Sequence, residues 1–113
     1  MEQITVYEKP TCTTCRNLAT LLRDNGIEFD KVNYFNEPFT EANLADLAAK
    51  TGQPAFYMVR GAGAAGITED TPEAEVIRAM VADPNLIQRP IVQVGDKAVV
   101  ARPVEKALTL LKP

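Results

Sequence analysis

Two cysteines three positions apart, Cys12 and Cys15, carry the most evident chemistry of this chain. They follow a short β-type run over residues 4–7 and precede or begin a helix predicted from Thr13 to Asp24. The first turn of a helix has unpaired backbone N–H groups and the positive end of the helix dipole, which stabilise a thiolate relative to its thiol. Arg16 adds a full positive charge nearby. We therefore expect Cys12 to act as a nucleophile.

The spacing of the two cysteines also suits a disulfide between them. Cys15 would then act as a resolving thiol, attacking an adduct formed on Cys12. The alternatives are half of a zinc site or two unreactive thiols. A zinc site within one chain is disfavoured, because the sequence has only two cysteines and no histidine. Redox or nucleophilic use is the favoured interpretation, since the pair lies in a βαβ-like pattern.

The composition is that of an ordinary globular chain of 113 residues, with 46% hydrophobic and 24% charged residues. This length predicts one domain, residues 1–113, that needs no disulfide to hold its core. A net charge of -3 argues against general binding to nucleic acid or to an anionic membrane. With no membrane-length apolar run and no signal-peptide pattern, we expect a mature chain that begins at Met1 in the cytoplasm. Thiols are kept reduced there, which favours a catalytic or redox-sensing cysteine pair.

The first half of the chain predicts a parallel β-α-β unit. Residues 28–34 form its second strand, which runs parallel to the first because a helix joins them. A second helix is capped by Thr40 and ends before Gly52. Residues 54–60 fit a short helix or a buried strand equally well, because periodicity does not distinguish the two. Residues 61–66, GAGAAG, predict a mobile loop or lid rather than a phosphate site, since no Lys-Ser or Lys-Thr pair follows.

The second half predicts a helix, a hairpin and a last helix. Thr71 and Pro72 suit a helix start, as the capping residue and the first helical residue. Residues 91–94 and 97–100 flank a Gly-Asp turn and predict an antiparallel hairpin, and Pro103 starts the final helix. The order of elements predicts an α/β fold: a mixed four-stranded sheet with flanking helices and a helical insertion in the middle of the chain.

Two segments carry a resemblance to a known family. Residues 10–17 read PTCTTCRN, and residues 83–92 read DPNLIQRPIV, followed by GDKAVVARP at 95–103. Together they resemble the arsenate reductase family with a thioredoxin-like fold, which includes glutaredoxin-coupled arsenate reductases and Spx-type regulators. The resemblance covers essentially the whole chain. It implies a thioredoxin-like fold and a cis peptide bond between Arg89 and Pro90.

The resemblance also implies roles for particular residues. A Cys12 thiolate attacks arsenate while arginines hold the oxyanion: Arg60 and Arg89 match two of the family's arginines, and Arg102 falls near the third. Arg16 is a further candidate, or it serves mainly to lower the pKa of Cys12. Planar guanidinium groups suit an anion with several acceptor oxygens. No bound cofactor is implied, and glutathione or a dithiol protein, with glutaredoxin or thioredoxin as partner, supplies the electrons.

One departure separates this chain from the glutaredoxin-coupled enzymes, which usually have serine where it has Cys15. An internal disulfide that thioredoxin or glutaredoxin then reduces is therefore open to this chain. Without histidine, a proton would come from arsenate, water or a carboxyl such as that of Glu8. Spx-type regulators share the cysteine pair, so a redox-switched regulator that binds RNA polymerase is an alternative. A generic disulfide reductase is another.

Overall fold

Four strands form one mixed sheet in the order β2-β1-β3-β4. In the computed structural model, which describes residues 3–9 and 11–111, they are β1 (Ile4–Glu8), β2 (Asp30–Asn33), β3 (Ile91–Val94) and β4 (Lys97–Val100). β1 and β2 pair in parallel, whereas β1 pairs with β3 and β3 with β4 in antiparallel fashion. The predicted mixed four-stranded sheet is confirmed, and so is its parallel first connection.

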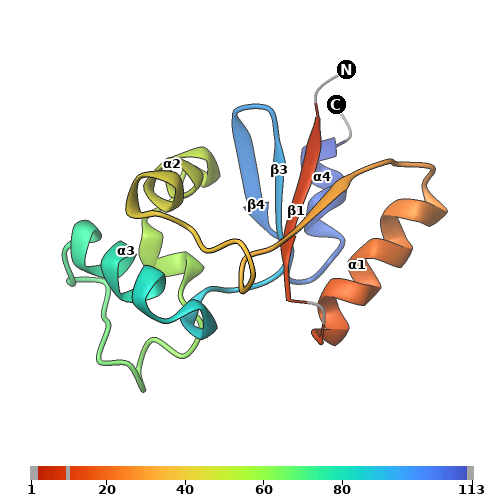
Figure 1. Ribbon diagram of the computed structural model, residues 1–113. Coiled ribbons are helices and arrows are strands. Elements are labelled where there is room, and N and C mark those ends of the chain that lie inside the picture. The colour runs from red at the N-terminus through yellow and green to blue at the C-terminus, as the bar shows by residue number, and fades with distance from the viewer. Residues whose placement is uncertain (1–2, 10, 112–113) are drawn as a thin grey trace.

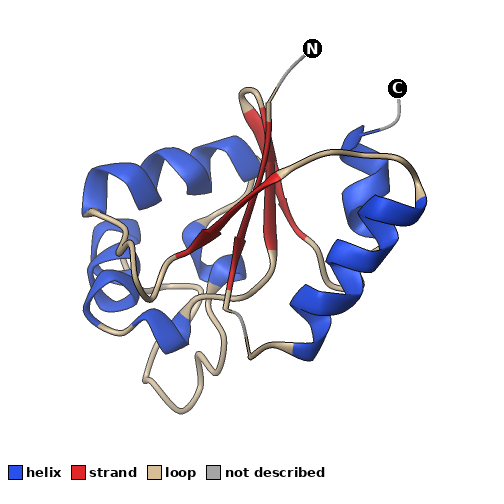
Figure 2. Ribbon diagram, turned by 45° about the vertical axis from the view of Figure 1, so that its right-hand side comes forward, coloured by secondary structure: helices blue, strands red, loops and turns tan. Residues whose placement is uncertain are grey.

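Helices cover both faces of this sheet (Figures 1 and 2). One face carries α1 (Thr13–Asp24) and α4 (Lys106–Leu111). The other side carries the middle of the chain: α2 (Glu41–Thr51), the 3-10 helix η1 (Ala55–Met58), α3 (Glu73–Ala82) and the 3-10 helix η2 (Pro84–Leu86). The predicted helical insertion therefore lies together on one side of the sheet.

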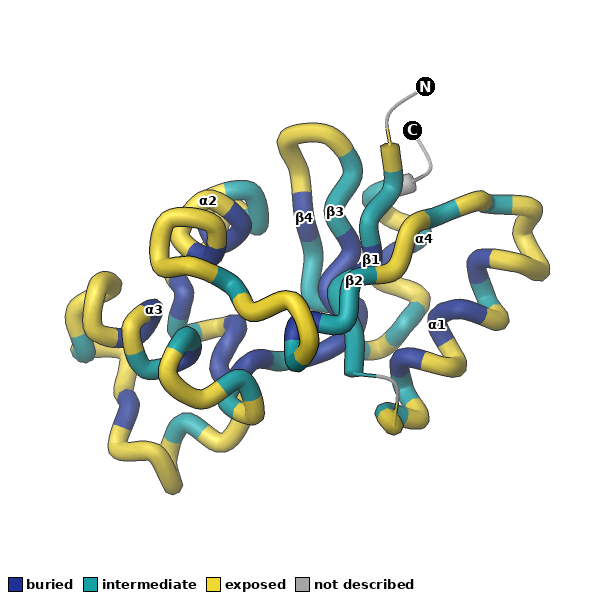
Figure 3. The backbone as a smooth tube through the Cα atoms, viewed as in Figure 1, coloured by how far each residue is buried: buried dark blue, intermediate teal, exposed yellow. Residues whose placement is uncertain are grey.

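Two hydrophobic cores lie on the two faces, because successive residues of a strand point to opposite sides. Val92 of β3 packs on the α1 side with Leu18 and Leu22, whereas its neighbour Ile91 packs on the α2 side with Leu44. In Figure 3 the buried stretches of α1 face the sheet and its exposed stretches face outward. Each central strand thus contributes side chains to both cores, which fixes its register.

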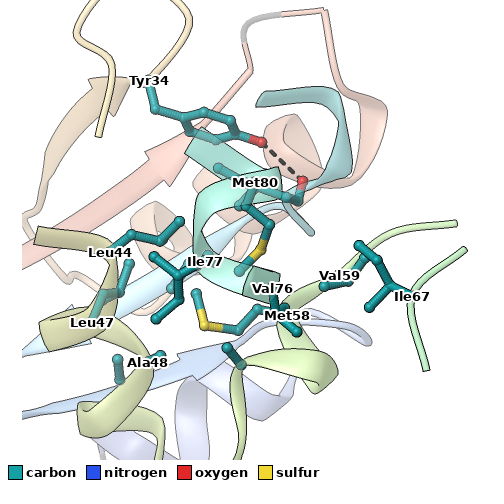
Figure 4. Close-up of a cluster of buried hydrophobic side chains, with 14 residues drawn as sticks. Tyr34, Leu44, Leu47, Ala48, Met58, Val59, Ile67, Val76, Ile77 and Met80 are labelled. Atoms are coloured by element: carbon teal, nitrogen blue, oxygen red, sulfur yellow. Dashed lines mark hydrogen bonds between the residues drawn. The ribbon is translucent and has the colours of Figure 1, made fainter. Parts of the chain in front are cut away.

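The larger core is shown in Figure 4. It gathers the apolar faces of α2 (Leu44, Leu47, Ala48) and α3 (Val76, Ile77, Met80), all of them buried. Tyr34, which follows β2, is fully buried in it, and its hydroxyl donates to the carbonyl oxygen of Ile87 over 3.1 Å. This bond ties the segment after β2 to the segment before β3 and satisfies the one polar atom of a buried ring.

The predicted helix starts were right for α2 and wrong for α3. The hydroxyl of Thr40 caps α2 by accepting from the N–H of Asn43 over 3.1 Å, and Gly52 ends the helix in the left-handed region at φ 73°. Thr71 does not cap α3, because its hydroxyl accepts instead from the N–H of Thr68 over 2.9 Å. The α3 helix begins at Glu73 without a side-chain cap, because the hydroxyl that could cap it is used in a local turn.

Other boundaries also differ from the sequence prediction. The second strand is shorter than residues 28–34, and the last helix begins at Lys106 rather than at Pro103. The ambiguous residues 54–60 divide into η1 and a single bridge between Val59 and Ile87. Pro10 lies outside the described residues. Within the described part of the chain, no helix is both long and apolar enough to cross a membrane.

Candidate active site

Three chain segments meet at one edge of the sheet. The antiparallel register places Tyr7 opposite Ile91 and Ile91 opposite Val100. The end of β1, the start of β3 and the end of β4 therefore lie side by side, as Figure 1 shows. The residues just beyond these ends include Cys12, Arg89 and Arg102, so the topology gathers residues that are up to 90 positions apart in sequence.

Cys12 occupies the N-cap position of α1. Its backbone is extended (φ -84°, ψ 120°), and its sulfur accepts from the N–H of Cys15 over 3.3 Å. Its own N–H donates to the carbonyl of Lys9 over 3.0 Å. A sulfur at this position receives the unpaired N–H groups of the first turn, which is the role of an anionic or hydroxyl cap. The helix start predicted from sequence therefore has the expected geometry.

The surroundings lower the pKa of the Cys12 thiol. Burial raises this pKa, but hydrogen bonds from the Cys15 thiol and from the backbone N–H groups of Cys15 and Thr14 outweigh burial, and the positive charge of Arg102 adds to them. Cys12 is partly exposed, so a small molecule can reach the sulfur. A partly exposed sulfur with a depressed pKa is the chemical profile of a nucleophile.

Cys15 has the opposite character. It is 1% exposed, and burial together with its hydrogen bond to Cys12 raises the pKa of its thiol to about 12. Both cysteines are free thiols in this structure. One thiol of the pair is thus prepared to ionise and the other to keep its proton, which is the division expected between an attacking and a resolving cysteine.

A hollow of about 330 Å³ opens in front of Cys12. It is lined by Lys9, Thr11, Cys12, Thr13, Thr14, Arg60, Arg89 and Arg102. Three of the four arginines predicted from the sequence therefore face the same space as the predicted nucleophile. We call this space the Cys12 hollow. Its described lining holds four cationic side chains and no carboxylate, so it offers a net positive field to an anion.

Arg89 is the buried cation of the Cys12 hollow. It is 7% exposed, and its Nη1 donates to the carbonyl of Ile87 over 3.4 Å. Its Nε is buried and has no acceptor among the described residues. The Arg89–Pro90 peptide bond is cis, as the resemblance implied, and so is the Arg102–Pro103 bond. A buried guanidinium with an unused donor is costly in isolation, so a bound anion would stabilise it.

Arg102 connects the segment before β3 to the first turn of α1. Its Nε donates to the carbonyl of Arg89 over 2.8 Å, and its Nη2 donates to the hydroxyl of Thr14 over 3.3 Å. Arg60 is exposed and follows the bridge between Val59 and Ile87. Two hydrogen bonds therefore fix the position of the Arg102 side chain, whereas Arg60 is an exposed residue of the hollow.

Arg16 lies outside the Cys12 hollow, contrary to the sequence prediction. Its Nη2 donates to the hydroxyl of Thr13 over 3.3 Å, and it lines a different hollow together with Glu8 and Lys31. Glu8, suggested above as a proton carrier, lies 3.9 Å from the ammonium of Lys31. The charge that lowers the pKa of Cys12 comes from Arg102 instead. The physical reason is that Arg16 projects from the flank of α1, while the Cys12 hollow lies ahead of its first turn.

The sequence analysis missed Lys9 and the threonines of the Cys12 hollow. Lys9 directly follows β1 and points into the same space as the arginines. The available signal was its position between the end of the predicted first strand and the cysteine motif. Among the described residues, no group of three or more His, Cys, Asp or Glu side chains is placed to hold a metal ion.

Comparisons with known proteins identify relatives that match nearly the whole chain. The ArsC family profile matches residues 7–110. The chain is 33% identical to an arsenate reductase of Yersinia enterocolitica, over 98% of this chain and 82% of that protein. It is 30% identical to the uncharacterized protein YfgD of Escherichia coli, over 97% and 98%.

A solved structure extends the agreement to three dimensions. An arsenate reductase from Vibrio cholerae superposes with a TM-score of 0.84 at 25% identity and covers 96% of this chain and 97% of that one. The sheet order, the flanking helices and the family match together establish the thioredoxin-like α/β fold predicted from the sequence. The chain therefore belongs to the ArsC family.

Proposed function

We propose that this chain is a thiol oxidoreductase that reduces arsenate to arsenite, with Cys12 as the nucleophile. The observation that supports this proposal most strongly is the Cys12 hollow: a thiol with a depressed pKa faces four cations and, among the described lining residues, no carboxylate. A doubly charged tetrahedral oxyanion suits such a space because it carries concentrated negative charge and several acceptor oxygens. The arsenate reductases among the relatives support arsenate as that oxyanion.

In the first step, the Cys12 thiolate attacks arsenic. A sulfur–arsenic bond forms and an arsenic–oxygen bond breaks, and the departing oxygen leaves as water with protons from arsenate or solvent. Arg60, Arg89 and Arg102 bind the remaining oxygens, and the first-turn N–H groups of α1 add to the positive field. No imidazole takes part, because the chain has no histidine.

In the second step, Cys15 attacks the sulfur of Cys12. The sulfur–arsenic bond breaks, its electron pair reduces As(V) to As(III), and a Cys12–Cys15 disulfide forms as two thiols lose two electrons. The proton of Cys15 passes to the departing arsenite. The raised pKa of Cys15 supports this order, because the Cys12 thiolate itself contributes to it and is consumed in the first step.

An external dithiol then restores the enzyme. Thioredoxin, or glutaredoxin with glutathione, would reduce the disulfide in the cytoplasm, where thiol systems are kept reduced. The competing route uses glutathione directly on the arsenic adduct and leaves Cys15 idle. The buried position of Cys15 beside Cys12 favours the internal route.

The test is steady-state formation of arsenite from arsenate, run once with thioredoxin and its reductase and once with glutathione, glutaredoxin and their reductase. We expect turnover by the wild-type chain and none by Cys12→Ser. Cys15→Ser should lose the thioredoxin-driven reaction. Absence of arsenite with both reducing systems would remove the proposal, and disulfide reduction without arsenite would point to a generic disulfide reductase instead.

A further inference from the structure

One aromatic ring lies against two cations of the Cys12 hollow. The ammonium of Lys9 is 5.0 Å from the centroid of the Phe35 ring, and the guanidinium carbon of Arg89 is 5.9 Å from the same centroid. Both distances are within the range in which a ring attracts a cation. Phe35 lies in the turn after β2 and does not itself line the hollow in front of Cys12.

These two cations have no acidic partner in the described part of the chain. The ion pairs there join Lys31 to Glu8, Lys50 to Asp46 and Arg78 to Glu41. A carboxylate in the place of Phe35 would also attract Lys9 and Arg89, but it would cancel their charge. A neutral ring attracts them through its quadrupole and leaves their full charge for a ligand.

The ring of Phe35 is itself fixed. It stacks on Tyr34 with centroids 5.0 Å apart and planes inclined by 28°, and its backbone N–H donates to the side chain of Asn33 over 3.0 Å. The Tyr34 hydroxyl and the Nη1 of Arg89 both donate to one acceptor, the carbonyl of Ile87. Tyr34, on which the Phe35 ring stacks, and Arg89 are therefore bound to the same backbone oxygen.

We infer that Lys9 and Phe35 belong to the oxyanion site: Lys9 is a fourth binding cation, and Phe35 is the positioning residue that holds Lys9 and Arg89 in place without neutralising them. This inference rests on the proposed function, because it assigns the two residues to the binding of the same oxyanion. It adds one ligand contact and one supporting residue that the resemblance to arsenate reductases did not supply.

The experiment measures oxyanion binding separately from turnover. Arsenate and inorganic phosphate are titrated by calorimetry into the full chain carrying Cys12→Ser, which cannot react. In that background we expect Phe35→Leu to raise the dissociation constant about fivefold and Lys9→Met about tenfold. Phe35→Tyr, which keeps an aromatic face, should restore binding to within about twofold of the parent.

Matched controls separate this effect from folding. Phe29→Leu makes the same change in a partly buried ring of the other core, and Lys97→Met removes an exposed lysine at the start of β4. Both should leave the dissociation constant unchanged. Equal affinity in the Phe35→Leu and Phe35→Tyr chains, or no loss with Lys9→Met, would overturn the inference while leaving arsenate reduction intact. No oxyanion binding by the Cys12→Ser parent would overturn the inference, whereas wild-type chain that binds but makes no arsenite would remove the proposed function alone.

Discussion

Two hollows beside α1 have similar size and similar numbers of cations, yet only one has the properties of an oxyanion site. The Cys12 hollow, of about 330 Å³, contains one lysine and three arginines. The hollow on the flank of α1, of about 360 Å³, contains Arg16, Arg23 and Lys31, and we call it the flank hollow. It also contains Glu8, whose carboxylate lies 3.9 Å from the ammonium of Lys31. The number of cations therefore does not distinguish the two hollows, whereas the carboxylate of Glu8 in the flank hollow does.

The two hollows also differ in what the helix offers them. The Cys12 hollow lies ahead of the first turn of α1, where backbone N–H groups are unpaired and the helix dipole is positive. The flank hollow lies against Ala19 and Thr20, where the backbone groups of α1 already bond to one another. The same helix thus creates a reactive site at its end and a solvated charged surface along its side.

Among changes in the Cys12 hollow, removing the sulfur of Cys12 should have the largest effect on arsenite formation. Cys12→Ser replaces the nucleophile with a hydroxyl that is not ionised, so we expect arsenite formation to fall at least about 1,000-fold. Steady-state assays at neutral pH measure this. A serine chain with more than a few per cent of wild-type activity would show that the chemistry does not depend on this hollow.

Changing the buried guanidinium should have the next largest effect. Arg89→Lys keeps a charge but loses the planar fork and the bond to the Ile87 carbonyl, and we expect kcat/KM for arsenate to fall about 100-fold. Arg23→Lys makes the same exchange in the flank hollow and should change kcat/KM by less than about twofold. Equal effects of the two exchanges would break the distinction between the hollows.

Arg102→Gln tests whether the positive charge of the Cys12 hollow lowers the pKa of Cys12. The charge of Arg102 lowers the pKa of Cys12, so its removal should raise that pKa and move the acid limb of the kcat/KM profile to higher pH. At pH 6 we expect a loss of about tenfold or more, because the variant also loses bonds to Arg89 and Thr14. An acid limb at the same pH as in the wild-type chain would show that Arg102 acts only through its hydrogen bonds and not through its charge.

The cysteine pair should also give stability a maximum near the ordinary cysteine pKa of about 8.5. Cys12 has a depressed pKa when folded, so its contribution grows as pH rises towards that value. Cys15 has a raised pKa, about 12, so its contribution is complete below 8.5 and is lost above it. Urea unfolding at several pH values should show a difference of up to about 1.4 kcal/mol per pH unit between wild type and Cys15→Ser on the alkaline side. Parallel curves there would contradict the raised pKa.

Arg16→Gln should have the smallest effect. This side chain is exposed and lies in the flank hollow, so we expect arsenite formation within about twofold of wild type and an unchanged Cys12 pKa. A loss comparable to that of Arg102→Gln would restore the role that the sequence suggested for Arg16.

The parts of the fold that depend on local pattern could be predicted from the sequence. The apolar stripes of α1 and α2, the cap at Thr40 and the hairpin all follow from spacing within one element. The start of α3 could not be predicted in this way, because the hydroxyl of Thr71 accepts from the N–H of Thr68 in a local turn and does not cap the helix.

The site shows the same division. Placement of Arg89 and Arg102 beside Cys12 follows from the sheet order, which the family resemblance implied, but the direction of Arg16 depends on rotation about the axis of α1. Lys9 and Phe35 were missed because a lone lysine and a lone aromatic residue carry no pattern of their own. Their relation appears only when β1 and the turn after β2 lie side by side.

Ultraviolet titration of the thiolate, as the difference spectrum between wild type and Cys12→Ser, tests most directly whether the Cys12 hollow prepares its sulfur for attack. We expect the thiolate of Cys12 to form at a lower pH than that of an ordinary cysteine, and the thiol of Cys15 to stay protonated until strongly alkaline pH. A Cys12 that ionises with an ordinary or raised pKa would contradict the central role given to this hollow.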